Sequence, residues 1–206
     1  MKKVILIFLI AIVLSGCTVV RIDTSDIDTI TNVVLSKKNK LYNQVGQGYK
    51  YYLPGGVTYI DSDELNDILY CNGNYYYLYI DAINYYYKKD ISYVENKNLY
   101  YSRNFNIDDG FNHNGYLQIK EVDGLYHIEF VYNYAKIEAI VEKKDINDTI
   151  LNSSYILSTI KYNYNIVELM LNKDYFINKT GKYNDFETDG NSGKFEIKKE
   201  NEMKEG

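Results

Sequence analysis

The pattern that most constrains the fold is an Asp-Gly pair between two alternating stretches. Residues 116–122 and 125–133 alternate apolar and polar side chains on either side of Asp123-Gly124. A period of two is typical of strands with one buried face, and Asp-Gly suits a two-residue type I′ turn. We therefore expect a β-hairpin here, with Ile128 and Phe130 on its buried face.

Residues 136–142 continue the same alternation and predict a third strand, which extends the hairpin into an antiparallel meander. The polar positions on the second and third strands are His127, Glu129, Lys136, Glu138 and Glu142. Two carboxylates at a suitable separation can hydrolyse a glycosidic bond, so the three glutamates are candidate acids. Acidic side chains are also common on the solvated face of a sheet, and that interpretation stays open.

A long strand is predicted over residues 75–87, after an Asn72-Gly73 turn. Its odd positions form a tyrosine row: Tyr75, Tyr77, Tyr79, Tyr85 and Tyr87. If exposed, such a row is a rigid amphipathic platform that can stack on sugars or grip a peptide. The alternative is burial of the row beneath a helix. The chain has 25 tyrosines and one proline, a bias that AT-rich codons also explain.

Two helices are expected to flank this sheet. Residues 26–38 follow a capping box of Ser25 and Asp28, and a helix through residue 160 follows a cap at Asp145. Pro54-Gly55-Gly56 indicates a turn between two extended runs. Residues 61–67 favour a short helix, 102–115 a polar loop, and 165–171 either a strand or a helical turn. The predicted class is α+β, and its element order is similar to that of the PsbP/Mog1-like sandwich.

The N-terminus has the layout of an export signal. Lys2 and Lys3 precede an uncharged apolar run over residues 4–14. The next residues complete Leu14-Ser15-Gly16-Cys17, which resembles the lipobox of bacterial lipoproteins. The resemblance implies cleavage before Cys17 and attachment of acyl chains such as palmitate to its thiol. Two chains are enough for stable anchoring, so we expect a lipid-anchored, extracytoplasmic protein on the outer face of the cell membrane.

The expected domain organisation follows from this signal. Residues 1–16 are a signal peptide, 17–24 a lipidated tether, 25–187 a single α+β domain and 188–206 a charged disordered tail. Loss of Lys2 and Lys3 changes the formal net charge from −5 to −7. An acidic protein is repelled by nucleic acid, which we exclude as a partner. The codon bias further suggests an origin in low-GC bacteria.

Signatures of catalysis and metal binding are weak. Cys71 and His127 are a candidate nucleophile and base, but a lone cysteine is more often a small core residue. Zinc would draw on Cys71, His113 and His127, without closely spaced ligand pairs. Asn104, Asn106 and Asp108 resemble the start of a calcium loop whose glycine is one position late. We expect no catalytic residue, metal or cofactor.

The leading hypothesis is a non-catalytic binding or accessory module that is held on the membrane through Cys17 and binds an envelope protein or glycan. The alternative is a cell-envelope hydrolase with an acid-based or Cys71-based site. Convergence of these groups in one pocket would discriminate the two. A solute-binding lipoprotein is less favoured, because two lobes that enclose a ligand need a longer chain.

Overall fold

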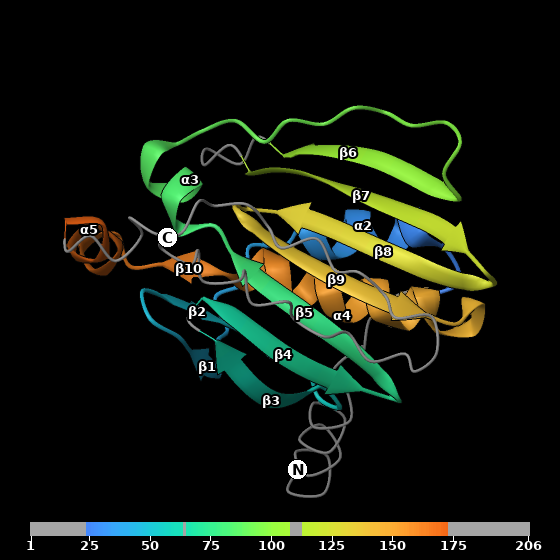
Figure 1. The fold of residues 1–206 in the computed structure, drawn as a ribbon, viewed down its shortest axis with the longest axis horizontal. Coiled ribbons are helices and arrows are strands. Elements are labelled where there is room, and N and C mark those ends of the chain that lie inside the picture. Colours follow the sequence, from blue (N-terminus) through green and yellow to red (C-terminus); the bar gives the residue numbers. More distant parts are fainter. Residues whose placement is uncertain (1–23, 64, 108–112, 173–206) are drawn as a thin grey trace, which may run out of the picture.

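A computed structural model describes residues 24–63, 65–107 and 113–172 (Figure 1). Its architecture is α+β with antiparallel sheets, as the sequence predicts. The large sheet has seven strands in the order β3-β4-β5-β9-β8-β7-β6. Their bounds are β3 Thr58–Asp63, β4 Asn66–Cys71, β5 Asn74–Ile80, β6 Tyr101–Ile107, β7 His113–Val122, β8 Leu125–Tyr132 and β9 Ala135–Val141.

A small three-stranded sheet lies beside it, in the order β1-β2-β10. Its strands are β1 Gln44–Val45, β2 Tyr49–Tyr51 and β10 Lys161–Tyr162. The helices are α2 Ile27–Leu35, α3 Ala82–Tyr87, α4 Ile146–Thr159 and α5 Tyr164–Asn172, and the 3₁₀ turn η1 Lys143–Asp145 precedes α4. Figure 1 shows α2 and α4 side by side behind the large sheet, while α3 and α5 lie at one end of the molecule.

The core lies between the large sheet and the pair of helices α2 and α4. We call the sheet surface that packs on these helices the helix face, and the opposite surface the outer face. Fully buried side chains meet here, namely Leu78, Leu117, Ile119, Phe130 and Ile137 from the sheet and Ile30, Ile150, Ile156 and Leu157 from the helices. Burial of such side chains stabilises the fold by about 1.5–3 kcal/mol each.

The predicted hairpins are confirmed where the turn sequence is explicit. Val122 pairs with Leu125 across Asp123-Gly124, whose φ angles of 52° and 80° are those of a type I′ turn. Asn72-Gly73 likewise joins β4 to β5 with two positive φ angles. The third strand of the meander is also present as β9, paired antiparallel with β8.

The prediction of one strand over residues 75–87 is wrong. Strand β5 ends at Ile80, and helix α3 begins at Ala82. Asp81 caps this helix, since its Oδ1 accepts a hydrogen bond of 2.9 Å from the backbone N–H of Asn84. A side chain that satisfies a free N–H at a helix start outweighs the β propensity of the tyrosines that follow.

The predicted loop over residues 102–115 is wrong, because most of it is paired. Strands β6 and β7 align from Tyr101 opposite Ile119 to Ile107 opposite His113. Asn104 and Asn106 therefore lie in a strand, whereas Asp108 lies outside the described residues. The short helix expected over residues 61–67 is also a strand region, since β3 and β4 pair there. Pairing with the next strand along the chain decided both segments, and local composition does not report it.

Helix α2 confirms the predicted N-terminal helix but begins differently. Its N-cap is Asp26, not Ser25, and the Asp26 carboxylate accepts from the N–H of Thr29 at 2.8 Å. Helix α4 confirms the late helix, although Asp145 makes no side-chain cap and η1 occupies that position. The segment 165–171, which was predicted as a strand or a helical turn, is part of α5.

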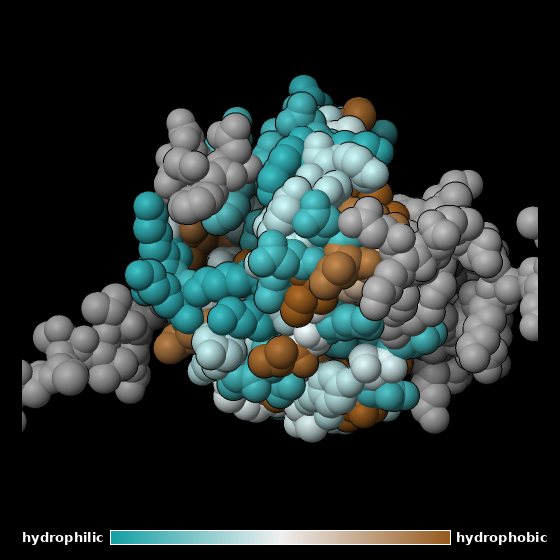
Figure 2. All heavy atoms as spheres, turned by 90° about the vertical axis from the view of Figure 1, so that its left-hand side faces the viewer, coloured by the Kyte–Doolittle hydropathy of each residue, from teal (hydrophilic) through white to brown (hydrophobic). Residues whose placement is uncertain are grey.

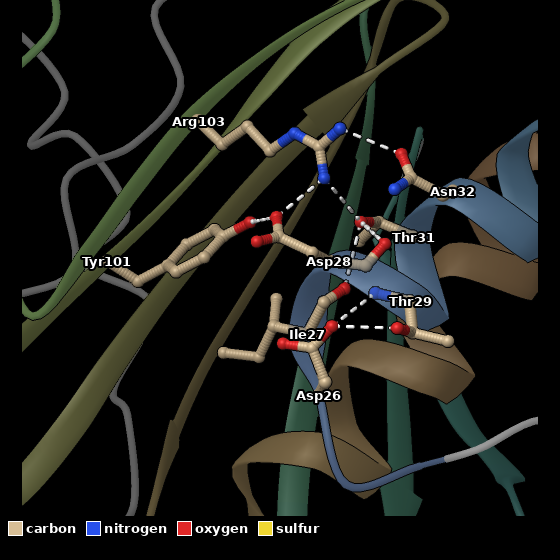
Figure 3. Close-up of polar contacts among 8 residues, drawn as sticks. All are labelled: Asp26, Ile27, Asp28, Thr29, Thr31, Asn32, Tyr101 and Arg103. Carbon is tan, nitrogen blue, oxygen red and sulfur yellow. Dashed lines mark hydrogen bonds and ion pairs between the residues drawn. The ribbon is translucent and has the colours of Figure 1, made fainter.

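Polar contacts tie α2 to the edge strand β6 (Figure 3). The guanidinium of Arg103 donates to Asp28 Oδ1 at 2.6 Å and to Asn32 Oδ1 at 2.7 Å. The Tyr101 hydroxyl donates to the same Asp28 oxygen at 2.6 Å. On α2, the contacts involve Asp28 and Asn32, which are one helical turn apart. On β6, they involve Tyr101 and Arg103, which point to the same side of the strand. They fix the first described helix against the far edge of the large sheet.

A buried acid joins the two sheets. Asp67 of β4 is 5% exposed, and its two carboxylate oxygens accept hydrogen bonds from Tyr49 and Tyr51 of β2, at 3.0 and 2.8 Å. Desolvation raises the pKa of Asp67, while the two hydroxyl donors lower it. A buried carboxylate is costly unless its oxygens are hydrogen-bonded, and this pair of donors supplies that requirement.

Candidate functional site

A groove of about 490 Å³ lies on the outer face of the large sheet, over β7, β8 and β9. We call it the carboxylate groove, and its polar lining consists of Asn96, Gln118, Lys120, His127, Glu129 and Glu138. Leu99 and Ile140 contribute apolar walls. The alternation of each strand places these polar side chains opposite the core, as the sequence pattern predicts for His127 and Glu129.

The segment between α3 and β6 forms one wall of this groove. The Gln118 amide Nε2 of β7 donates to the carbonyl of Val94 at 3.2 Å. The hydroxyls of Tyr93 and Ser102 lie 2.9 Å apart, and the Tyr93 ring contacts that of Tyr116 with centroids 5.6 Å apart. The segment is thus held to the strands whose side chains form the floor.

Two carboxylates meet at the floor of the groove. Glu129 of β8 and Glu138 of β9 are direct cross-strand partners. Like charges in this position destabilise a sheet. Each has a compensating partner: the Tyr116 hydroxyl donates to Glu129 Oε1 at 2.5 Å, and Lys136 Nζ lies 2.6 Å from Glu138 Oε1. The Lys136 side chain is only 4% exposed, so this ion pair is well shielded from water.

The electrostatics keep two groups uncharged at neutral pH. Burial, and then its bond to Glu129, raise the pKa of Tyr116, so its hydroxyl remains a proton donor. Burial, and then the positive charge of Lys120, lower the pKa of His127 below its usual value of 6.5. A neutral imidazole offers one donor and one acceptor nitrogen. The groove thus presents acceptor carboxylates beside amide and imidazole donors.

The structure disperses the predicted tyrosine row. Tyr77 and Tyr79 are buried at 5% and 6% exposure, whereas Tyr75 is half-buried. Tyr85 and Tyr87 belong to α3, where Tyr85 stacks on Tyr162 at 3.9 Å and Tyr87 is 61% exposed. These five side chains therefore do not form one continuous exposed row on a strand, because the chain turns at Asp81.

The structure does not bring Cys71 and His127 together. Cys71 lies on the helix face, where Asn152 Nδ2 of α4 donates to its sulfur at 3.7 Å, whereas His127 lies on the outer face. Burial raises the pKa of the Cys71 thiol, which disfavours the nucleophilic thiolate. Cys71 and His127 therefore do not form a nucleophile and base, and the buried Cys71 fits the interpretation as a small core residue.

The remaining candidate groups are also separate. Glu142 follows β9 and pairs at the surface with Lys144, 2.7 Å away, so only Glu129 and Glu138 of the three glutamates share the groove. His113 lies on the helix face beside the Tyr132 ring. Within residues 24–63, 65–107 and 113–172, no three histidine, cysteine, aspartate or glutamate side chains are placed to hold a metal ion.

The sequence reasoning missed Tyr116 and Lys136 as the partners of the two groove carboxylates, Glu129 and Glu138. The register of β8 against β9 follows from the two-residue turn at Asn133-Tyr134, with φ angles of 52° and 57°. Counting outward from that turn places Glu129 opposite Glu138. Because the turn lacks glycine, its sequence does not indicate a hairpin.

At the end of the molecule that carries α5, a hollow of about 370 Å³ lies between β2, β10 and the start of α5. Figure 2 shows the end that carries α3 and α5, where hydrophobic atoms form small separate patches among hydrophilic ones. The exposed large apolar residues on these two helices are Tyr87, Tyr164, Ile166 and Leu169. Scattered apolar side chains are normal on protein surfaces and carry no functional indication.

Comparison with known proteins gives one match. Residues 1–18 match the family model of the prokaryotic membrane lipoprotein lipid attachment site. This match supports a lipoprotein that is anchored to a membrane through lipid, and it agrees with the lipobox read from residues 14–17. Cys17, the signal segment 1–16 and the predicted tail 188–206 lie outside the described residues.

No curated protein and no solved structure matches the chain. The similarity of element order to the PsbP/Mog1-like sandwich and the low-GC origin therefore stay predictions. Among the residues that the structure describes, no helix is both long and apolar enough to cross a membrane.

Proposed function

We propose that the protein is a non-catalytic binding module on the outer face of the cell membrane, anchored by two acyl chains on Cys17 after removal of residues 1–16. The lipid attachment site supports the anchor. The observation that carries the binding role is the pairing of Glu129 with Glu138 on the floor of a groove. Its ligand is a polar component of the cell envelope.

The fold keeps an electrostatically unfavourable arrangement on the floor of the groove. Two adjacent carboxylates on a sheet reduce stability, yet here Tyr116 and Lys136 hold both in place. Carboxylate oxygens accept hydrogen bonds from hydroxyl and amide groups, which abound in glycans and peptides of the envelope. Gln118 and the neutral His127 add donors on the same surface. The groove is thus suited to a hydrogen-bonding ligand.

Photo-crosslinking on living host cells tests this proposal. A photoreactive residue replaces Lys120, which lines the groove, and a matched control replaces Lys144, which is exposed beside Glu142. We expect one abundant envelope component to be captured from position 120 but not from 144. Capture should be lost with Cys17→Ala, which releases the protein from the membrane. Identical products at the two positions, or none at 120, would contradict a ligand in the groove.

The acid-based hydrolase remains the alternative, because Glu129 and Glu138 do share one groove. Incubating the purified protein with isolated cell walls separates the two functions. A binding module sediments with the walls and releases no soluble fragments. Release of fragments by the wild type, and its loss in Glu129→Gln or Glu138→Gln, would instead establish catalysis. We favour binding because both carboxylates already accept strong hydrogen bonds within the protein.

A further inference from the structure

A second hollow, of about 360 Å³, lies where the small sheet meets the edge of the large one. It is separate from the carboxylate groove, since Asp67 belongs to the helix face of β4. Three tyrosines line it, Tyr49 and Tyr51 from β2 and Tyr59 from β3, together with Asp67. Gln44, Gln47 and Ser62 complete the polar part of the lining. We call it the tyrosine pocket.

The tyrosines and the acid form one hydrogen-bonded unit. Tyr49 and Tyr51 stack nearly parallel, with centroids 6.1 Å apart and an interplanar angle of 10°. Both donate their hydroxyl protons to Asp67, so their own oxygens keep lone pairs that can accept bonds from a ligand. Burial and the nearby Asp67 raise the pKa of both tyrosines, which keeps them protonated in this role.

The backbone is shaped to bring the Tyr49 ring into place. Gly46, in the turn between β1 and β2, lies directly beneath that ring. A Cβ atom at Gly46 would stand 2.2 Å from Cζ of Tyr49, a separation that side chains do not tolerate. Any larger residue at position 46 would displace the ring and with it the bond to Asp67. The pocket therefore depends on a glycine that packs against the ring.

We propose that the tyrosine pocket binds an organic ammonium group. Asp67 is the acidic side chain of the lining, and no lysine or arginine among the described lining residues offsets its charge. The faces of tyrosine rings attract cations, and clusters of aromatic rings recognise ammonium ligands. Each oxygen of Asp67 has accepted one hydrogen bond and retains a second lone pair for an N–H donor. A bound cation would also offset the cost of burying the carboxylate.

The test uses the full chain in detergent micelles and two ammonium probes, choline and ethanolamine. Their neutral control is 3,3-dimethyl-1-butanol, which replaces the choline nitrogen by carbon. Tyrosine ring signals are followed by NMR at constant ionic strength. We expect saturable shifts with at least one ammonium probe and an affinity for the neutral alcohol at least about tenfold weaker, a ratio that corresponds to 1.4 kcal/mol. Preference for choline indicates a quaternary ligand, and preference for ethanolamine a primary amine.

Three variants locate the binding. Asp67→Asn removes the charge, and Tyr59→Ala removes a ring that is 39% exposed, so we expect this variant to fold. Tyr42→Ala is the matched control, because Tyr42 is 53% exposed and lies outside the pocket lining. We expect the first two variants to weaken ammonium binding about tenfold or more and the control to leave it unchanged. If Asp67→Asn does not fold, Tyr59→Ala decides the question.

The outcomes that overturn the proposal are direct. Equal affinity for the alcohol and the ammonium probes would show that charge is not recognised. Unchanged binding in Tyr59→Ala, or no saturable shift with either probe, would show that the pocket is not the site. Because the tyrosine pocket and the carboxylate groove share no residue, neither result bears on the proposed function.

Discussion

Glu129 and Glu138 lie directly opposite each other on neighbouring strands, at a position where sheets usually avoid two like charges. We predict that Glu129→Gln raises the free energy of unfolding by about 0.2–1 kcal/mol, because the amide relieves the repulsion and still accepts a hydrogen bond from Tyr116. Urea denaturation measures the change, which should shrink at high salt. Glu142→Gln, at an exposed ion pair, is the matched control and should change stability by less than about 0.5 kcal/mol. A large loss in Glu129→Gln would show that the charge itself holds the sheet together.

Ser153 of α4 provides a second prediction. It is fully buried, and its hydroxyl has no hydrogen-bond partner within the described residues. Ser153→Ala removes this unpaired group and improves helix propensity, so we expect stabilisation of about 1 kcal/mol. Ser154→Ala is the matched control, since the Ser154 hydroxyl donates to the Ile150 carbonyl at 2.6 Å. Thermal unfolding should rank Ser153→Ala above both the wild type and Ser154→Ala.

His127 makes stability depend on pH. Its pKa in the folded state lies below the unfolded value of 6.5, so the unfolded chain takes up the proton first. The associated stability is fully present above pH 6.5 and is lost as the pH falls toward the lower folded pKa. Urea denaturation between pH 7.5 and 5 should show this loss in the wild type and a smaller one in His127→Gln.

NMR titration of the imidazole signals checks the cause. We expect His127 to titrate below 6.5, and we expect Lys120→Gln to raise its pKa only in part, because burial is the larger cause and Lys120 the smaller. A His127 signal that titrates at or above 6.5 would contradict a neutral imidazole in the groove.

Arg103 is predicted to hold the edge strand β6 through its planar, two-pronged shape. Arg103→Lys keeps the positive charge but cannot reach Asp28 and Asn32 together, so we expect a loss of about 1 kcal/mol. Hydrogen exchange in Arg103→Lys should be faster than in the wild type at the amides of β6, and unchanged at the amides of β8. An unchanged exchange rate in β6 would mean that pairing with β7 alone holds the strand.

Local signals accounted for the parts of the fold that the sequence predicts well. Asp123-Gly124 and Asn72-Gly73 both adopt positive φ angles that few residues tolerate. Each turn can therefore be predicted from two adjacent residues. The strands next to them follow by counting outward from the turn. The α4 helix was likewise predicted from apolar spacing that the packed core confirms.

Contacts between distant segments account for the rest. Residues 101–107 are rich in polar side chains, and only β7 on one side and α2 on the other make them a strand. The bonds of Asp67 to Tyr49 and Tyr51 join strands of two different sheets. No spacing rule within the sequence can anticipate an encounter of that kind, and the tyrosine pocket depends on it.

The short distance in sequence between the lipid attachment site and α2 limits how far the domain can lie from the membrane. Helix α2 begins at Ile27, ten residues after the cysteine of the lipid attachment site. Ten residues span about 35 Å when fully extended. With acyl chains on that cysteine, the domain explores a thin layer next to the bilayer, and a partner in the same layer meets it at a high effective concentration. If the groove binds a ligand in that layer, as proposed, a longer tether between the lipid and α2 should lower its occupancy gradually even with the groove unchanged.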